Sequence, residues 1–199
     1  MNDDKTAWMW GIFDETGIFM ALCRHGFVML VVDMVRSREM WVLIGDLMND
    51  DSDQHSKRAK YPLAVTNALL QAFGNRVGIG YDIRCKFGLT VSKSKLGPLA
   101  DELNLRLLVG AFHGHAHQWL CQLSNLTTYT QGLGLEDLEG CEWFFSKSDA
   151  LASSTRYATA FHRQQSIVEY FRHTDTFETY ANLSKSVLLY SSTLPSMSN

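Results

Sequence analysis

The chain has 199 residues, of which 46% are hydrophobic and 20% charged, so it is long and apolar enough for one folded domain, or a domain with a tail. This composition excludes wholesale disorder. The longest apolar run, from Phe27 to Val32, is far shorter than the roughly 20 residues of a membrane span. The net charge of -3 contrasts with the clustered positive charge that is expected for an autonomous nucleic-acid-binding domain.

The N-terminus predicts an intracellular protein that is not secreted. Residues Met1 to Lys5 are mostly polar, and no apolar segment of the kind found in a secretory signal follows them. The four cysteines are therefore expected to be thiols or metal ligands and not a disulfide framework.

The first part of the chain is predicted to form strands. Apolar runs at Trp10–Phe13 and Ile18–Ala21 are separated by residues with hairpin-turn chemistry, and Phe27–Val32 is typical of a buried strand. The segment from Arg38 to Arg58 then becomes polar and is expected to be a partly disordered surface excursion.

The middle of the chain alternates between helix and strand. Pro62 and Gly74 bracket a predicted helix, and a short strand is expected from Val77 to Ile83. A short helix from Gly97 to Leu103 and a buried strand from Leu105 to Phe112 follow. Helices are expected for 114–126 and, after the Gly132-Leu133-Gly134 turn, up to about residue 186, before a frayed tail at 191–199. This order of elements indicates an α/β or α+β layer fold.

Three acidic residues could hold a metal ion. Asp82 lies where a hydrophobic strand ends, which is where open α/β sheets bind ligands, although a turn-capping aspartate is the commoner interpretation. Glu139 and Glu142 are three residues apart and would share one face of a helix. Acidic residues in a first helical turn also complement the helix dipole without any catalytic role.

The segment from Phe112 to Cys121 holds the densest group of metal-ligand residue types. His117 and Cys121 are four residues apart, so on a helix they would face the same way, with His113 within reach. Zinc accepts such a mixture of nitrogen and sulfur, and a fourth ligand could be Cys23 or His25. The alternative is that these histidines only form hydrogen bonds at a strand-to-helix corner.

Arg156 and Arg163, together with several hydroxyl residues on a predicted helix, could contact phosphates, or could form an ordinary solvated helix face. The sequence contains no Gly-x-Ser-x-Gly, Walker or dinucleotide-binding motif, which disfavours serine hydrolases, P-loop NTPases and enzymes with a nucleotide cofactor.

An ordered series of short blocks resembles the Kyakuja-Dileera-Zisupton (KDZ) transposases from about Trp8 to Ser192. The blocks are Trp10–Phe19, Cys23–Gly26, Asp33–Ser37, Lys60–Ala64, Gly80–Cys85, Phe112–His117 with Cys121-Gln122, Gly132–Glu139 and Ser154–Arg156. The resemblance implies a ribonuclease-H-like mixed sheet flanked by helices, with a helical C-terminal part. It also implies Asp-Asp-Glu chemistry, in which carboxylates hold two Mg²⁺ ions for DNA strand cleavage and transfer in the nucleus, and it is compatible with an oligomer.

Carried over to this chain, Asp82 matches the second acid of the family, and the last acid falls at Glu142 or Glu139. Trp143 stands where the family usually has an arginine after the glutamate. His117 and Cys121 match a His and a Cys of the family, as structural or target-strand-positioning residues.

Two departures from the family bear on activity. The first catalytic Asp of the family lies upstream of the Trp10–Phe19 block, and Asp14 and Asp33 do not sit in its motif, so its first strand is expected to be missing. An insertion is expected at about 39–58, within a partial domain spanning 8–190, while 1–7 and 191–199 are expected to be disordered.

The resulting hypothesis is a transposase fragment that lacks catalytic activity. Two alternatives stay open: a small non-enzymatic binding or regulatory protein with a His/Cys zinc site, and a translated relic without a selected role.

Overall fold

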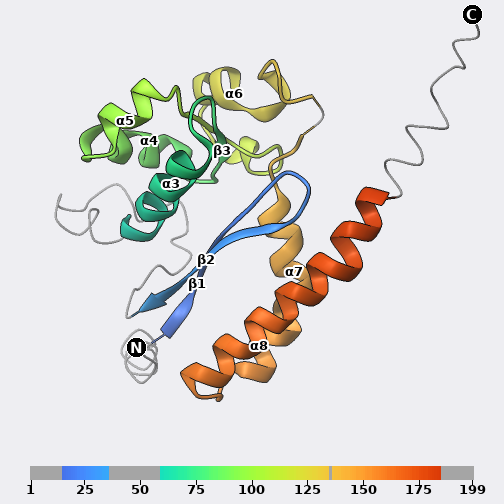
Figure 1. The fold of residues 1–199 in the computed structure, drawn as a ribbon. Coiled ribbons are helices and arrows are strands. Elements are labelled where there is room, and N and C mark those ends of the chain that lie inside the picture. The colour runs from blue at the N-terminus through green and yellow to red at the C-terminus, as the bar shows by residue number, and fades with distance from the viewer. Residues whose placement is uncertain (1–14, 36–58, 135, 185–199) are drawn as a thin grey trace, which may run out of the picture. The chain divides into compact units, whose positions relative to one another are not determined.

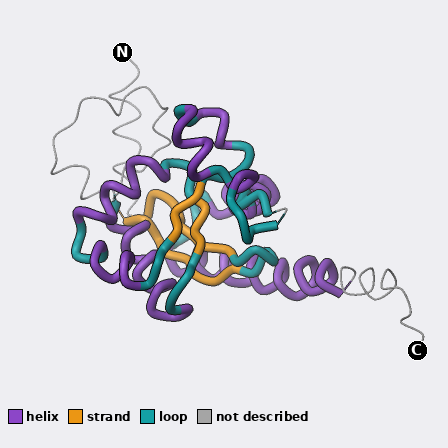
Figure 2. Tube along the Cα trace, turned by 90° about the horizontal axis from the view of Figure 1, so that it is seen from above, coloured by secondary structure: helices purple, strands orange, loops and turns teal. Residues whose placement is uncertain are grey.

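The computed structural model describes residues 15–35, 59–134 and 136–184 (Figure 1). The chain divides into two compact units, each of which is described by itself. The first comprises Met1–Ala21 and Leu30–Glu139, and the second comprises Leu22–Met29 and Gly140–Asn199. Helices make up most of the described chain, and the strands form two separate two-stranded sheets (Figure 2).

Strands β1 (Glu15–Leu22) and β2 (Val28–Val35) pair with each other through a short turn. The turn is closed by the Cys23 N–H, which donates to the Phe27 carbonyl at 3.0 Å, and Gly26 adopts a φ of 91° that favours glycine. So short a connection requires an antiparallel hairpin, because a parallel pair needs a long crossover. The strands predicted around Ile18–Ala21 and Phe27–Val32 are confirmed, whereas Trp10–Phe13 lies outside the described residues.

The second sheet is parallel. Strand β3 (Gly78–Gly80) pairs with β4 (Arg106–Leu108), and Ile79 is opposite Leu107. Helices α4 (Arg84–Lys93) and α5 (Gly97–Glu102) provide the crossover between them. Because the strands are parallel, the residues that follow β3 and those that follow β4 emerge at the same edge of the sheet.

The core of the first unit lies between this crossover and helix α3 (Lys60–Phe73). Leu70, Phe87, Val91 and Ala100 form a buried cluster. Helix α3 ends where Gly74, at a φ of 72°, donates its N–H to the Leu70 carbonyl, which confirms the helix predicted from Pro62. Helix α5 confirms the short helix predicted from Gly97.

The segment after β4 differs from the single helix expected for 114–126. A 3-10 helix (His113–Ala116) is followed by α6 (Trp119–Asn125) and a second 3-10 helix (Thr127–Tyr129). The backbone between the first two is extended at His117 and Gln118, with ψ values of 155° and 147°, which interrupts helical hydrogen bonding.

The second unit is built from two long helices, α7 (Gly140–Thr155) and α8 (Ala160–His173), which contact each other, and α8 crosses in front of α7 in the view of Figure 1. Phe144 of α7 packs edge-on against Phe171 of α8, with ring centroids 5.3 Å apart. Thr159 caps α8, and a π-helical turn (Thr174–Thr179) continues it. The ring of Phe27, in the hairpin turn, packs against the ring of Tyr180, with the ring centroids 4.9 Å apart.

These elements confirm the α/β class and the helical C-terminal part. The expected single mixed sheet differs from the structure, since the described residues form two two-stranded sheets and each strand of the second has only three residues. The segments expected to be disordered or inserted, 1–7, 39–58 and 191–199, lie outside the described residues. Within the described ranges, no helix is both long enough and apolar enough to cross a bilayer.

Candidate metal centre

Asp82 lies in the turn that joins β3 to α4, at the carboxyl edge of the parallel sheet. Its side chain is exposed, and Oδ1 accepts the backbone N–H of Ile83 at 2.8 Å. The Arg84 Nε donates to the Leu107 carbonyl at 3.1 Å, which ties the start of α4 to β4. The turn is therefore anchored to the sheet, while the Asp82 carboxylate faces solvent.

Cys85, His117 and Cys121 come together beside this turn. The Cys85 Sγ lies 2.8 Å from the Cys121 Sγ and 3.2 Å from the His117 Nδ1, and the Cys121 Sγ lies 3.6 Å from the same nitrogen. The three side chains are partly buried. Among the described residues, they are the one group of three or more His, Cys, Asp and Glu side chains close enough to share a metal ion.

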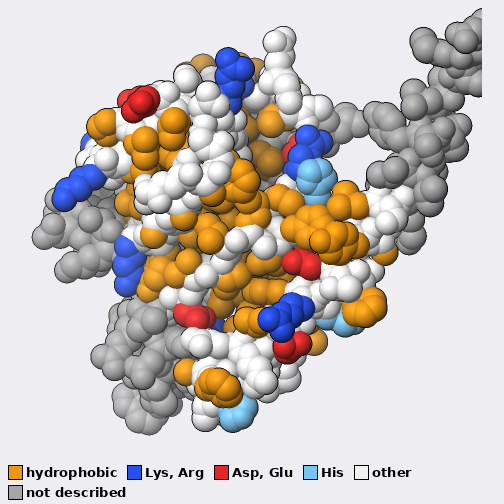
Figure 3. Space-filling model, viewed as in Figure 1, with side chains coloured by type: hydrophobic (Ala, Val, Ile, Leu, Met, Phe, Trp, Pro, Cys, Tyr) orange, Lys and Arg blue, Asp and Glu red, His pale blue; other side chains and the backbone are white. Residues whose placement is uncertain are grey.

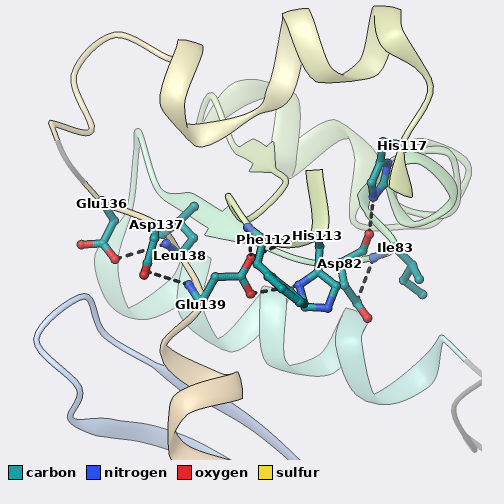
Figure 4. Close-up of polar contacts among 9 residues, drawn as sticks. All are labelled: Asp82, Ile83, Phe112, His113, His117, Glu136, Asp137, Leu138 and Glu139. Carbon is teal, nitrogen blue, oxygen red and sulfur yellow. Dashed lines mark hydrogen bonds and ion pairs between the residues drawn. The ribbon is translucent and has the colours of Figure 1, made fainter. Parts of the chain in front are cut away.

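The tautomer of His117 follows from its second contact. Its Nε2 lies 2.6 Å from the backbone oxygen of Asp82 (Figure 4). A carbonyl oxygen can only accept, so Nε2 carries the proton of the neutral ring. The Nδ1 lone pair then faces the two thiols, which is the arrangement of a metal-binding histidine oriented by an outer hydrogen bond.

The chemistry of these three donors fits zinc better than magnesium. Thiolate sulfur and imidazole nitrogen suit Zn²⁺, whereas Mg²⁺ prefers oxygen ligands. A zinc–sulfur bond of about 2.3 Å places two sulfurs of a tetrahedron about 3.8 Å apart, so the two cysteines would separate modestly on binding. The three protein ligands leave one tetrahedral position for another ligand.

In the metal-free protein, the Cys85 thiol holds its proton. Burial raises the pKa of the Cys85 thiol, and its hydrogen bond with Cys121 and the charge of Cys121 raise it further, against a smaller lowering by Arg84. Zinc binding must therefore displace a proton from Cys85.

Two amides brace the ligands from the α6 side. The Gln122 Nε2 donates to the His117 carbonyl at 2.7 Å, and the Asn125 Nδ2 donates to the Cys121 carbonyl at 3.1 Å. The Asn125 amide also lies 3.7 Å from the Cys121 Sγ. Amides donating towards a thiolate stabilise its negative charge.

Glu139 makes a separate network at the same end of the sheet (Figure 4). Its side chain is 6% exposed, and Oε1 accepts the backbone N–H of Phe112 at 2.9 Å and of His113 at 3.2 Å. Its Oε2 lies 2.9 Å from the His113 Nδ1. The expected zinc ligand His113 thus contacts a carboxylate, and Cys85 stands in the metal-ligand group instead.

The remaining predicted site residues lie in the second unit. Cys23 and His25, the suggested fourth zinc ligands, are in the hairpin turn, with the Cys23 Sγ 3.9 Å from the His25 Nδ1. Glu142 is exposed in the first turn of α7. Arg156 follows the end of α7 and is exposed, and Arg163 is a half-buried residue of α8.

Sequence reasoning overlooked Cys85 as a ligand. The signal for Cys85 was its place two residues after the Tyr81-Asp82-Ile83 block. When two strands are parallel, residues that follow β3 lie near residues that follow β4. Helix α4, which carries it, was also missed because Gly88 and polar residues dilute its apolar pattern.

Comparison with known proteins points to one family of transposases. A family model described as Kyakuja-Dileera-Zisupton transposase matches residues 1–44 and 42–175. No curated protein and no solved structure shows significant similarity to the chain.

Proposed function

Since the chain belongs to the Kyakuja-Dileera-Zisupton transposase family, we propose that its site is that of a two-metal DNA strand-transfer enzyme with Asp82 as one of its acids. The observation that carries the proposal is the place of Asp82, exposed at the carboxyl edge of the parallel β3–β4 pair. Carboxylates at that edge bind ligands in open α/β folds. A ribonuclease-H-like fold for the whole domain belongs to the same proposal.

Glu142 is the better candidate for the last acid. The Glu139 carboxylate is buried and already accepts two backbone N–H groups and contacts the His113 ring. Coordinating Mg²⁺ would take it from these partners and leave their N–H groups without this acceptor. Glu142 is exposed in the first turn of α7, so a metal ion could reach its carboxylate from solvent.

DNA is the proposed partner, with Arg156 and Arg163 as candidate phosphate contacts and the nucleus as the place of action. Lys and Arg side chains are scattered over the face of the described residues shown in Figure 3, among hydrophobic and polar ones. With a net charge of -3, this chain alone is expected to bind DNA weakly and with strong salt dependence.

We infer that the chain by itself cleaves DNA weakly or not at all. By resemblance to the family, two acids are proposed for this chain, Asp82 and Glu142, whereas the family chemistry uses three. The two family-matched segments meet at residues 42–44, within the span proposed as an insertion at about 39–58. An insertion there would add to the departure from the family pattern.

A second candidate function is zinc binding without catalysis. The Cys85, His117 and Cys121 group supports it, because its sulfur and nitrogen donors are the ones zinc prefers. In the combined proposal, zinc is a structural ion, and Mg²⁺ is held separately by carboxylates.

The experiment measures metal binding and DNA nicking with the full chain. Free Mn²⁺, which stands in for Mg²⁺, is followed by electron paramagnetic resonance during titration of wild-type, Asp82→Asn and Glu142→Gln proteins. Asp101→Asn is the matched control, since Asp101 is an exposed aspartate of α5. Nicking of supercoiled plasmid is assayed in Mg²⁺ and in Mn²⁺.

We expect Asp82→Asn to weaken Mn²⁺ binding at least tenfold, Asp101→Asn to leave it unchanged, and plasmid nicking to stay near background. Equal Mn²⁺ affinity in wild-type and Asp82→Asn proteins would remove Asp82 from the site. Strong nicking that Asp82→Asn abolishes would instead overturn the inferred inactivity.

A further inference from the structure

His117 connects the sulfur-containing group to the candidate catalytic acid. One nitrogen of its ring, Nδ1, lies against the Cys85 and Cys121 sulfurs. The opposite nitrogen, Nε2, lies 2.6 Å from the backbone oxygen of Asp82. A metal ion at the thiols and the main chain of Asp82 would thus hold the same imidazole from its two sides.

The Asp82 turn is also held from its C-terminal side. Cys85 follows Asp82 by three residues, and the Arg84 N–H donates to the Tyr81 carbonyl at 3.1 Å. A metal bound to Cys85 would fix the first turn of α4, while His117 fixes the carbonyl of Asp82. The Asp82 side chain itself is exposed and accepts a hydrogen bond from the neighbouring Ile83 N–H, so the position of its carboxylate depends on the local backbone.

We propose that the metal centre formed by Cys85, His117 and Cys121 positions the Asp82 carboxylate, and that His117 is the positioning residue. This rests on the proposed function, in which Asp82 binds the catalytic metal ion. Hydrogen bonds that orient the ligands of a metal change its affinity by about 10- to 100-fold in other metal sites. We expect an effect at the lower end here, because the contact reaches the backbone of Asp82 and not its carboxylate.

The decisive variant is His117→Cys. A third cysteine can still ligate zinc, but it has no Nε2 proton to donate to the Asp82 carbonyl. His117→Cys therefore separates zinc binding from the positioning hydrogen bond. Cys85→Ser removes a zinc ligand, and Cys23→Ser is the matched control outside the group.

Two quantities are measured on the full chain. Bound zinc is determined by elemental analysis after gel filtration, and Mn²⁺ affinity by electron paramagnetic resonance. Mn²⁺ competes poorly with Zn²⁺ for thiolate ligands, so it reports on carboxylates. Zinc-loaded wild-type protein is also compared with the same protein stripped by a chelator, which tests the coupling without any substitution that could impair folding.

We expect stripping, Cys85→Ser and His117→Cys each to weaken Mn²⁺ binding about tenfold, with His117→Cys retaining its zinc and Cys23→Ser behaving as wild type. If zinc-loaded and zinc-stripped wild-type proteins bind Mn²⁺ equally, or if His117→Cys keeps both zinc and full Mn²⁺ affinity, the positioning role is wrong. Asp82→Asn distinguishes this result from failure of the proposed function. Mn²⁺ affinity insensitive to Asp82→Asn would refute the site itself.

Discussion

Glu139 holds His113 at the corner where the chain leaves β4. The Glu139 Oε2 lies 2.9 Å from the His113 Nδ1, and Oε1 accepts the backbone N–H groups of Phe112 and His113. The Glu139 carboxylate is 6% exposed and accepts two part-buried N–H groups, so it stabilises the backbone that it binds. The segment before α7 is thereby fastened to the 3-10 helix that leads to His117.

Replacing this carboxylate is expected to destabilise the protein. Glu139→Gln removes the charge and one acceptor oxygen, and should lower the free energy of unfolding by about 1–3 kcal/mol. Urea unfolding followed by circular dichroism measures the change. Glu102→Gln, at an exposed glutamate of α5, is the control and should change it by less than about 0.5 kcal/mol. Equal unfolding midpoints for the two variants would contradict an anchoring role for Glu139.

Gly110 is expected to tolerate no side chain. A Cβ atom at this position would collide with the Glu139 carboxylate, and the residue is buried. Gly110→Ala should therefore lower the free energy of unfolding by about 1–3 kcal/mol through overpacking. Gly78→Ala is the matched control, because a Cβ there would make an ordinary contact of 3.7 Å with Leu108. If both alanine variants unfold at the same urea concentration, the Glu139 carboxylate is not as confined as these contacts indicate.

Zinc binding is expected to require Cys85. The chain should bind one equivalent of zinc per chain, and Cys85→Ser should reduce this to near zero because it removes one of three protein ligands. Cobalt substitution gives a second readout, since thiolate ligands produce characteristic charge-transfer absorption. Cys23→Ser should bind zinc as wild type does. Full zinc occupancy in Cys85→Ser would place the ion elsewhere.

The apparent zinc affinity is expected to increase with pH. Burial, followed by the interaction with Cys121, raises the pKa of the Cys85 thiol, so at neutral pH the metal-free protein holds a proton that zinc must displace. Below the thiol pKa, each displaced proton changes the affinity by about tenfold per pH unit. Competition with a chelating dye between pH 6 and 8, with the dye calibrated at each pH, measures the slope. An affinity independent of pH over this range would mean that Cys85 does not lose a proton on binding.

The helices and strands of the middle of the chain were predictable because their signals are local. Pro62 and Gly74 mark the start and end of α3, and Gly97-Pro98 marks the start of α5. Helix α4 was missed because only Phe87 and Val91 are buried in it, so its sequence shows little of the apolar periodicity that predicts a helix. The break at His117 and Gln118 was also missed, since it depends on hydrogen bonds made across the fold.

The candidate site was predictable in part. Asp82, His117 and Cys121 stood out by residue type and spacing, and the structure places His117 against both the Asp82 carbonyl and the Cys121 sulfur. The partner of His113 could not be deduced, because Glu139 follows it by 26 residues and no local pattern links them.

The sequence by itself determined the residue types available for chemistry, the class of fold and the resemblance to the KDZ transposases, because these depend on composition, local periodicity and ordered blocks. Only the tertiary structure decided which of those residues meet. Parallel pairing of β3 with β4 brings Cys85 to His117 and Cys121. The fold also places the Glu139 carboxylate where it accepts the backbone N–H groups of Phe112 and His113. Contacts between residues 26 to 36 positions apart depend on packing and strand register, which no local pattern encodes.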